Sequence, residues 1–134
     1  LGLLQLQHID ENIEKRKAID EAYRDGLKDV EGIRCHNPPA PIKKNYSYFP
    51  IFIEKKFSLT RDKLYGKLKA QRINVRRYFY PLASQLSLLR NSVLGGNQNY
   101  PGAMLSANSV ICLPTGDTVT ESDIKSIVRH IKNQ

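Results

Sequence analysis

The chain has 134 residues, of which 21 are Lys or Arg and 13 are Asp or Glu, so its formal net charge is +8. Hydrophobic residues make up 40% and charged residues 25%, which is the composition of a globular domain and excludes a disordered or collagen-like chain. The apolar runs at 49–53 and 110–113 are far shorter than the roughly 20 residues of a membrane helix, so no membrane span is expected.

The N-terminus and the two cysteines bear on whether the chain is part of a longer protein and on the compartment in which it occurs. The first residue is Leu and a helical pattern is already under way there, so we expect the chain to be part of a longer polypeptide. No basic leader precedes the first leucines, so no signal peptide is expected. Cys35 and Cys112 lack CxxC spacing, which favours buried or half-buried free thiols in the reducing cytoplasm.

The apolar spacing predicts one long leading helix over residues 2–28. Leu6, Ile9 and Ile13 recur at intervals of three and four, and the same spacing continues further along the segment. The following residues are polar and include a Gly, which indicates the end of the helix. Residues 31–35 are then expected to form a short strand.

Residues 46–53 are the clearest predicted strand, because they are aromatic and β-branched. The odd-numbered residues within 49–53 share one face. Pro50 has no N–H for the ladder, so we expect this strand at a sheet edge or at a bulge. The Pro-rich stretch at 37–41 must be a loop, because successive prolines are incompatible with both helix and ladder.

The middle of the chain shows helical and strand patterns in turn. A helix is predicted over residues 60–71, a strand over 73–79 and a short helix over 101–108. Residues 86–98 are weakly patterned, and Gly95-Gly96-Asn97 within them predicts a mobile loop.

The C-terminal elements have the strongest local signals. Residues 110–113 predict a strand, and Thr120 followed by Asp123 resembles a capping box at the start of the last helix. The apolar stripe of that helix is Ile124, Ile127, Val128 and Ile131.

These elements predict an α/β (α+β) fold with two layers, in which a small, mostly antiparallel sheet packs mainly on one face against amphipathic helices. We expect one unit over residues 1–134. It comprises the leading helix at 1–28 and a sheet-and-helix body at 31–134.

The residues with catalytic or metal-binding chemistry are scattered. His8, His36 and His130 are isolated, and no second Cys/His pair lies at zinc spacing, so no metal site is expected. The sequence contains no GxSxG motif, and the Gly95-Gly96 pair lacks the Lys-Ser/Thr of a P-loop. We therefore assign no catalytic residue to this chain.

A mixture of guanidinium and aromatic groups remains, at residues 72–80. In a strand, Arg76, Tyr78 and Tyr80 face one way, while Val75, Arg77 and Phe79 face the other. Such a mixture can hold phosphates and stack on bases, so one alternative is a stand-alone basic nucleic-acid or anion-binding module. In the other alternative the aromatic rings pack in the core and the arginines extend into solvent. A regulatory interaction domain is a third alternative.

Several motifs occur in order along the whole chain. They are the run Gly2-Leu3-Leu4-Gln5-Leu6 and the segments 46–51, 60–64, 73–82, 112–114 and 120–124. Together they resemble the C-terminal region of DegT-type sugar aminotransferases, which are pyridoxal-phosphate enzymes that aminate nucleotide-linked keto-sugars. Residues 76–82 are most similar to members that act on dTDP-linked 3-keto-6-deoxyhexoses.

This resemblance implies a C-terminal small domain like that of aspartate-aminotransferase-like enzymes. The cofactor lysine and most of the phosphate cup would lie in a missing N-terminal catalytic domain, in a parent enzyme that is a homodimer and uses pyridoxal phosphate. No cofactor is expected on this chain alone, which should be inactive, and nucleic acid is not an expected partner. By motif position, Arg77, Tyr78 and Tyr80 are the implied substrate-binding residues.

The sequence departs from the family pattern at a few positions. Arg72 stands where the preceding helix usually closes on Gly, whereas Gly66 lies inside that helix. Ala83 replaces a common His, which puts a His-mediated substrate contact in doubt. Gly116-Asp117 replaces a Tyr-Pro pair.

Overall fold

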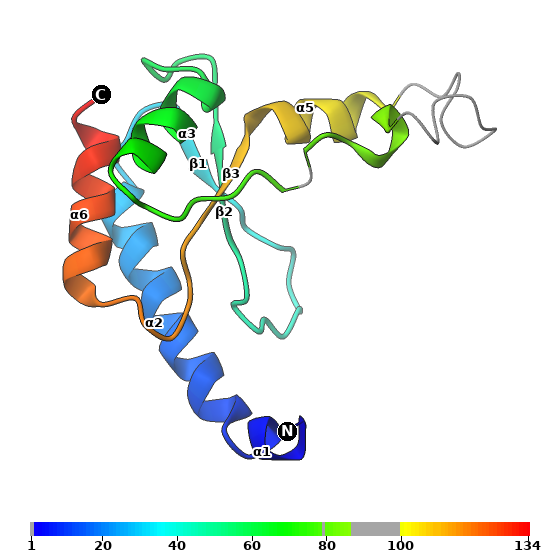
Figure 1. Ribbon diagram of the computed structural model, residues 1–134, viewed down its shortest axis with the longest axis vertical. Helices are drawn as coiled ribbons and strands as arrows, with labels where there is room; N and C mark the ends of the chain where they lie inside the picture. The colour runs from blue at the N-terminus through cyan, green and yellow to red at the C-terminus, as the bar shows by residue number, and fades with distance from the viewer. Residues whose placement is uncertain (1, 79, 87–99) are drawn as a thin grey trace.

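The computed structural model describes residues 2–78, 80–86 and 100–134 (Figure 1). Its helices are α1 (Gly2–Gln7), α2 (Ile9–Leu27), α3 (Arg61–Ala70), α5 (Pro101–Ser109) and α6 (Glu121–Lys132), with a 3-10 helix at Ala83–Gln85. Its strands are β1 (Ile33–Cys35), β2 (Phe49–Ile53) and β3 (Val110–Leu113). They form an antiparallel sheet in the order β1-β2-β3, which confirms the predicted α+β class.

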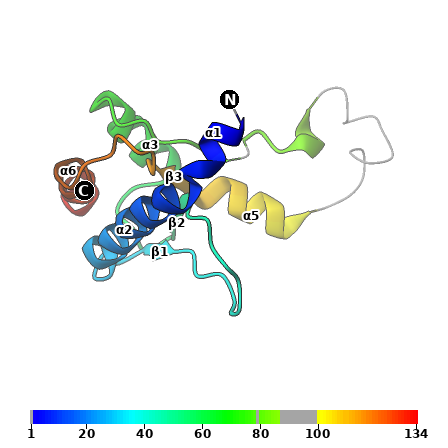
Figure 2. The same ribbon diagram turned by 90° about the horizontal axis from the view of Figure 1, so that it is seen from below.

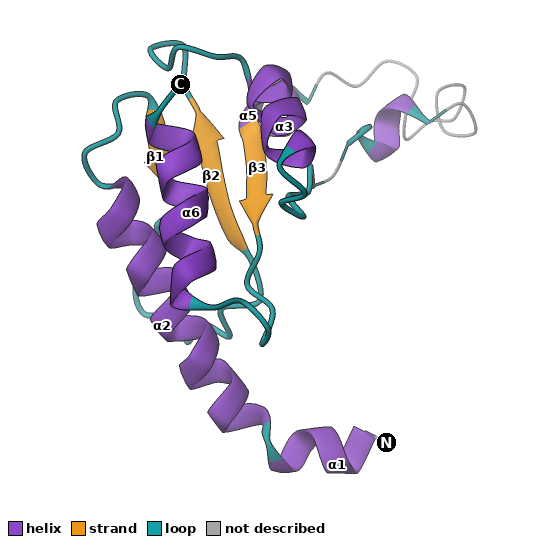
Figure 3. Ribbon diagram, turned by 60° about the vertical axis from the view of Figure 1, so that its left-hand side comes forward, coloured by secondary structure: helices purple, strands orange, loops and turns teal. Residues whose placement is uncertain are grey.

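The core lies between one face of the sheet and the helices α2 and α6. Ile51 of β2 pairs with Cys35 of β1 and with Ile111 of β3. Side chains alternate along β2, so Phe49, Ile51 and Ile53 are buried on the helix-covered face. Figure 3 shows α2 and α6 side by side against this face. The helical members of the core are Ile19, Tyr23, Leu27, Leu64, Leu68, Ile124, Ile127, Val128 and Ile131.

The last helix is formed as its sequence predicts. The Thr120 hydroxyl accepts a hydrogen bond from the Asp123 N–H at 3.2 Å, and the Asp123 carboxylate accepts one from the Thr120 N–H at 2.9 Å. This capping box satisfies donors of the first turn. The hydrogen bonds from Thr120 also lower the pKa of the Asp123 carboxyl. The predicted apolar stripe is buried against the sheet.

The leading helix differs from the prediction of one continuous element. It breaks at His8 into α1 and α2, and Figure 3 shows α1 directed away from the sheet. Leu3, Leu4 and Leu6 of α1 are 82%, 60% and 63% exposed, whereas the buried residues of α2 all lie in its C-terminal half. The apolar periodicity therefore continues into a part of the helix that no described element covers.

The position of Pro50 corrects a second prediction, because β2 is the central strand and not an edge. The Pro50 carbonyl accepts a hydrogen bond from the His36 N–H at 3.3 Å. In a regular ladder the backbone N–H of residue 50 would donate to the His36 carbonyl, but Pro50 has no N–H. The His36 carbonyl instead accepts a hydrogen bond from Arg24 Nη2 at 2.8 Å. A side chain of α2 thus replaces the missing ladder donor. The strand is also shorter than predicted, since it begins at Phe49, and Tyr46 has a φ of 53°, which lies outside the β region.

The other predicted helices are confirmed as α3 and α5, with Thr60 capping α3 and Pro101 in the first turn of α5. The predicted mobile loop at residues 95–97 lies outside the described residues. In the described part of the chain, no helix is both long enough and apolar enough to cross a membrane.

Candidate substrate-binding site

The site segment, residues 72–82, follows α3 and carries the predicted substrate-binding residues. It was predicted to contain a strand over 73–79, but its described residues form one isolated antiparallel bridge. Arg76 N–H donates to the Cys112 carbonyl at 3.1 Å, and Cys112 N–H donates to the Arg76 carbonyl at 2.8 Å. The chain then turns at Tyr78, and the Tyr80–Pro81 peptide bond is cis. The alternating residue types are compatible with a strand, but the backbone leaves β3 after one pair.

The start of this segment is fixed by the C-terminal cap of α3. Arg72 has a φ of 59°, in the left-handed region that favours Gly. Ile73 N–H donates to the Leu68 carbonyl at 3.1 Å, and Arg72 N–H donates to the Lys69 carbonyl at 2.9 Å. This is the hydrogen-bond pattern of a Schellman cap, with Arg72 at the position that Gly usually occupies.

The side chains of the segment do not alternate as a strand would place them. Arg77 and Tyr80, predicted on opposite faces, lie together, with the Arg77 guanidinium carbon 4.8 Å from the Tyr80 ring centroid. That guanidinium also stacks at 4.5 Å from the Tyr65 ring, and its Nη1 donates to Asp62 Oδ1 at 2.9 Å. Arg77 is therefore held against α3 by an ion pair and two rings. The predicted orientation of Phe79 lies outside the described residues.

Tyr78 lies instead with Arg76 and Tyr48. Arg76 Nη1 donates to the Tyr78 hydroxyl oxygen at 2.8 Å. The rings of Tyr78 and Tyr48 meet edge to face, with centroids 5.0 Å apart and planes at 71°. A hydrogen bond with Tyr78 raises the pKa of the Tyr48 hydroxyl.

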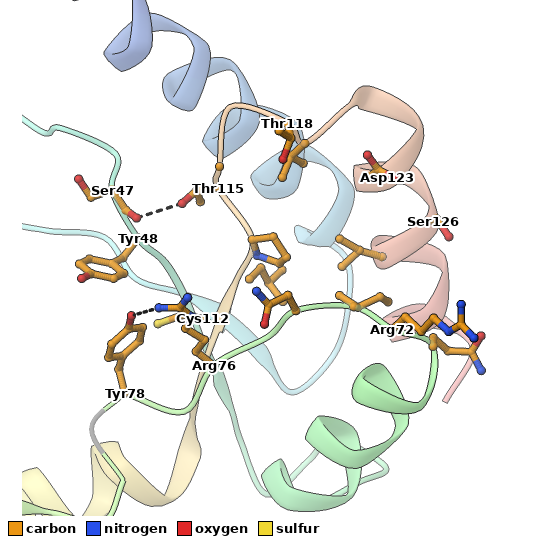
Figure 4. A pocket seen from close by; sticks show the side chains of 18 residues that line it. Ser47, Tyr48, Arg72, Arg76, Tyr78, Cys112, Thr115, Thr118, Asp123 and Ser126 are labelled. Atoms are coloured by element: carbon orange, nitrogen blue, oxygen red, sulfur yellow. Dashed lines mark hydrogen bonds between the residues drawn. The ribbon is translucent and has the colours of Figure 1, made fainter. Parts of the chain in front are cut away.

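Two hollows adjoin the site segment and share Arg76 and Tyr78. The larger cavity, of about 620 Å³, lies between the site segment, the end of β3 and the start of α6 (Figure 4). The smaller, of about 360 Å³, is lined by Arg77 and Tyr80. Of the three predicted residues, only Tyr78 lines both hollows, so the structure divides the predicted set between two neighbouring surfaces.

Arg61 is a residue that the sequence analysis did not single out. It opens α3, is only 4% exposed, and its guanidinium carbon lies 4.6 Å from the Tyr80 ring centroid. Its Nε is 2.9 Å from Asp62 Oδ1, but the N–H is not aimed at that oxygen, and neither Nε nor Nη1 has a hydrogen-bond partner among the described residues. A cation at the positive end of a helix was the sequence signal that could have identified it.

The two cysteines are free, and both are at least half-buried, as predicted. Cys112 lines the larger cavity, and burial raises the pKa of its thiol to about 11. Burial also raises the pKa of the Cys35 thiol. Since the thiolate is the nucleophilic form, neither side chain is activated for covalent chemistry at neutral pH.

The lysines do not fit the role of a cofactor lysine. A lysine that forms an imine needs a desolvated or cation-neighboured pocket. All twelve lysines lie in the described part of the chain, and each is exposed or half-exposed. The exposure of these lysines therefore differs from the desolvated surroundings that such a lysine needs. Ala83 and Gly116 are both exposed, and nothing in the structure explains these departures from the family pattern.

The fold is that of a small sheet-and-helix domain found in sugar aminotransferases. DesI, solved in the presence of its TDP-sugar product, has a TM-score of 0.90 and 25% identity, over 99% of this chain and 33% of that one. Helicobacter pylori PseC, an aminotransferase involved in pseudoaminic acid biosynthesis, has a TM-score of 0.85 at 19% identity, over 97% of this chain and 34% of its own. The second likeness concerns the fold alone.

The sequence places the chain in a family. Residues 1–132 match the DegT/DnrJ/EryC1/StrS aminotransferase family, and the chain belongs to it. A dTDP-4-amino-4,6-dideoxy-D-glucose transaminase of Escherichia coli is 40% identical over 128 residues, which is 96% of this chain and 34% of that protein. GDP-perosamine synthase of Vibrio cholerae is 26% identical over 99% of this chain and 35% of its own length. The chain thus spans about a third of the length of these curated relatives.

Proposed function

We propose that this chain is the C-terminal small domain of a pyridoxal-phosphate-dependent aminotransferase that transfers an amino group to a nucleotide-linked keto-sugar. The observation that carries the proposal is the family match over residues 1–132, together with 40% identity to a transaminase of a dTDP-linked amino sugar. Glutamate is the amino donor that we expect. The predicted 3-keto-6-deoxyhexose subgroup stays a prediction, because that relative is named for an amino group at carbon 4.

The role of this domain in the proposal is to form one wall of the active-site cleft and to contact the substrate. Tyr78 lines both hollows beside the site segment, so a sugar nucleotide bound in either hollow would lie next to it. Arg77 and Tyr80, the other two predicted residues, form the adjoining surface. Their contacts with α3 support a fixed wall, and the direct contact of all three with substrate remains a proposal.

The catalytic lysine and the phosphate cup belong, in this proposal, to an N-terminal domain of the same polypeptide. Bound pyridoxal phosphate supplies the electron sink for amino transfer. The exposed leucines of α1 support the presence of a covering partner. A homodimeric parent and a cytoplasmic location complete the proposal, and the free thiols of Cys35 and Cys112 support a reducing compartment.

The test uses the complete reading frame that contains this chain. The purified protein is incubated with pyridoxal phosphate, glutamate and dTDP-linked 3-keto or 4-keto 6-deoxyhexoses, and the products are analysed by mass spectrometry. We expect 2-oxoglutarate and a dTDP-linked amino sugar in equal amounts. A complete protein that aminates no nucleotide-linked keto-sugar would contradict the proposal.

The 134-residue chain alone is the matched control, and we expect no amino sugar from it. With one equivalent of pyridoxal phosphate it should also show no imine absorbance band that borohydride converts to a stable adduct. A single lysine trapped in that way would overturn the placement of the cofactor lysine outside this chain.

A further inference from the structure

Two adjacent arginines of the site segment differ in how their charges are matched. Arg77 donates to Asp62 and lies between the rings of Tyr65 and Tyr80, so its charge is already paired. Arg76 is exposed, and within the described residues it forms no ion pair with a carboxylate. Within the part of the chain that the structure describes, its one side-chain hydrogen bond goes to the Tyr78 hydroxyl oxygen, which leaves the rest of the guanidinium fork open there.

The contacts of Arg76 hold its guanidinium group in a defined position. Its backbone is fixed on both sides by the bridge to Cys112, and its Nη1 is fixed by Tyr78. Figure 4 shows Tyr48, Arg76 and Tyr78 together at one end of the larger cavity, Tyr48 from the segment before β2 and the other two from the site segment. Tyr48 is 59% exposed although its ring is large and apolar. A cation held in place beside an exposed aromatic ring suits a ligand that carries both a negatively charged group and an aromatic ring.

The charges that line the cavity agree with an anionic occupant. Asp123 is the single acidic side chain among the lining residues, and it is engaged in the capping box of α6. In Figure 4 it lies at the end of the cavity away from Arg76. No carboxylate among the lining residues therefore competes for the guanidinium of Arg76.

We propose that Arg76, Tyr78 and Tyr48 form a nucleoside-diphosphate corner, in which Arg76 binds phosphate oxygens and the Tyr48 ring stacks on the nucleobase. This inference rests on the proposed function and assigns the diphosphate to Arg76, not to Arg77. A guanidinium matches two phosphate oxygens at once, which gives paired charge-assisted hydrogen bonds. Stacking of a base on an aromatic ring tolerates different bases, so the corner recognises the nucleotide class.

The test measures binding of dTDP to the 134-residue chain by NMR titration, in wild type and in single variants. Arg76→Gln is expected to weaken dTDP binding at least about tenfold, because charge-assisted hydrogen bonds are lost. Arg76→Lys should restore part of the affinity, since it retains the charge but not the fork. Tyr48→Ala should weaken dTDP binding and leave inorganic pyrophosphate binding unchanged.

Arg72→Gln is the matched control. It removes the same charge from a residue that lines the same cavity, but Figure 4 places Arg72 far from Arg76. We expect the dTDP affinity of this variant to stay within about twofold of wild type at moderate salt, since Arg72 lies outside the proposed corner and salt screens exposed charges. Equal losses in Arg72→Gln and Arg76→Gln would show a general electrostatic effect and overturn the assignment.

Two further outcomes separate this inference from the proposed function. A larger loss in Arg77→Gln than in Arg76→Gln, with both variants folded by circular dichroism, would overturn the assignment to Arg76. Failure of the wild-type chain to bind dTDP at millimolar concentration would overturn the corner itself. Neither result affects the proposed function, which is tested by amino transfer in the complete enzyme.

Discussion

The sheet body and the site segment are held in the structure by different kinds of contact. The body consists of β1–β3, α6 and the C-terminal half of α2, and its contacts are buried apolar side chains. The site segment is joined to β3 by one backbone bridge and to α3 by an ion pair and cation–π contacts. The comparison teaches that the body is stabilised mainly by apolar burial, whereas the segment is positioned by polar and aromatic contacts with its neighbours.

The largest expected effect comes from the body. Ile131 of α6 is fully buried, so Ile131→Ala should lower the free energy of unfolding by about 3 kcal/mol through lost burial and the cavity that remains. Urea unfolding followed by circular dichroism measures this loss. Leu105→Ala is the control, because Leu105 is 73% exposed, and it should change stability by less than about 0.5 kcal/mol. Similar losses in both variants would contradict the placement of the core.

An intermediate effect is expected from alkaline pH at Cys112, where the two regions meet. Burial raises its pKa from 9.0 to about 11, so between these values the unfolded chain loses the proton while the folded chain keeps it. The stabilising contribution is complete below pH 9 and is lost as the pH rises towards 11. Cys112→Ala should therefore show a smaller fall in unfolding free energy over this range than wild type. An unchanged slope would mean that the thiol titrates alike in both states.

The body was largely predictable from the sequence because its signals are local. The capping residues and apolar stripe of α6 lie within twelve positions of one another, and β2 shows its alternation directly. The central position of β2 in the sheet was not predictable. The His36 carbonyl, to which Pro50 cannot donate, accepts a hydrogen bond from Arg24 of another element. A tertiary contact of that kind cannot be predicted from the local pattern of residue types.

The site segment was less predictable for a related reason. Its residue types alternate as in a strand, yet the side chain of Arg77 is placed by Asp62 and Tyr65 of α3 and lies against the Tyr80 ring. The burial of Arg61 likewise depends on the position of Tyr80, which sequence alone does not give. The proposed substrate-binding residues come from motif resemblance and stay a prediction, while their division between two hollows required the structure.

A smaller effect, of opposite sign, is expected at Arg61 of α3, which contacts the site segment through Tyr80. Arg61 is buried at the positive end of α3, and its Nε and Nη1 have no hydrogen-bond partner among the described residues, although Nε lies 2.9 Å from Asp62 Oδ1. Arg61→Met keeps an unbranched apolar side chain and removes these donors, so it should raise the free energy of unfolding by about 1 kcal/mol. The loss of stacking on Tyr80 is smaller, about 0.5 kcal/mol. A marked destabilisation in urea unfolding would show that the Arg61 contacts outweigh its buried unpaired donors.

The smallest effect concerns the cap that starts the site segment. Arg72 has a φ of 59°, which Gly adopts without strain, so Arg72→Gly relieves strain in the folded state. The greater freedom of Gly in the unfolded chain offsets part of this gain, which leaves an increase of about 0.5 kcal/mol in the free energy of unfolding. Gln71→Gly is the matched control, because Gln71 has an ordinary φ of −84°, and it should instead lower stability by about 0.5 kcal/mol. Thermal unfolding measures both changes in stability. Changes of opposite sign at these two adjacent positions distinguish relief of backbone strain from a general effect of Gly at this helix end. Changes of equal sign would contradict the left-handed cap.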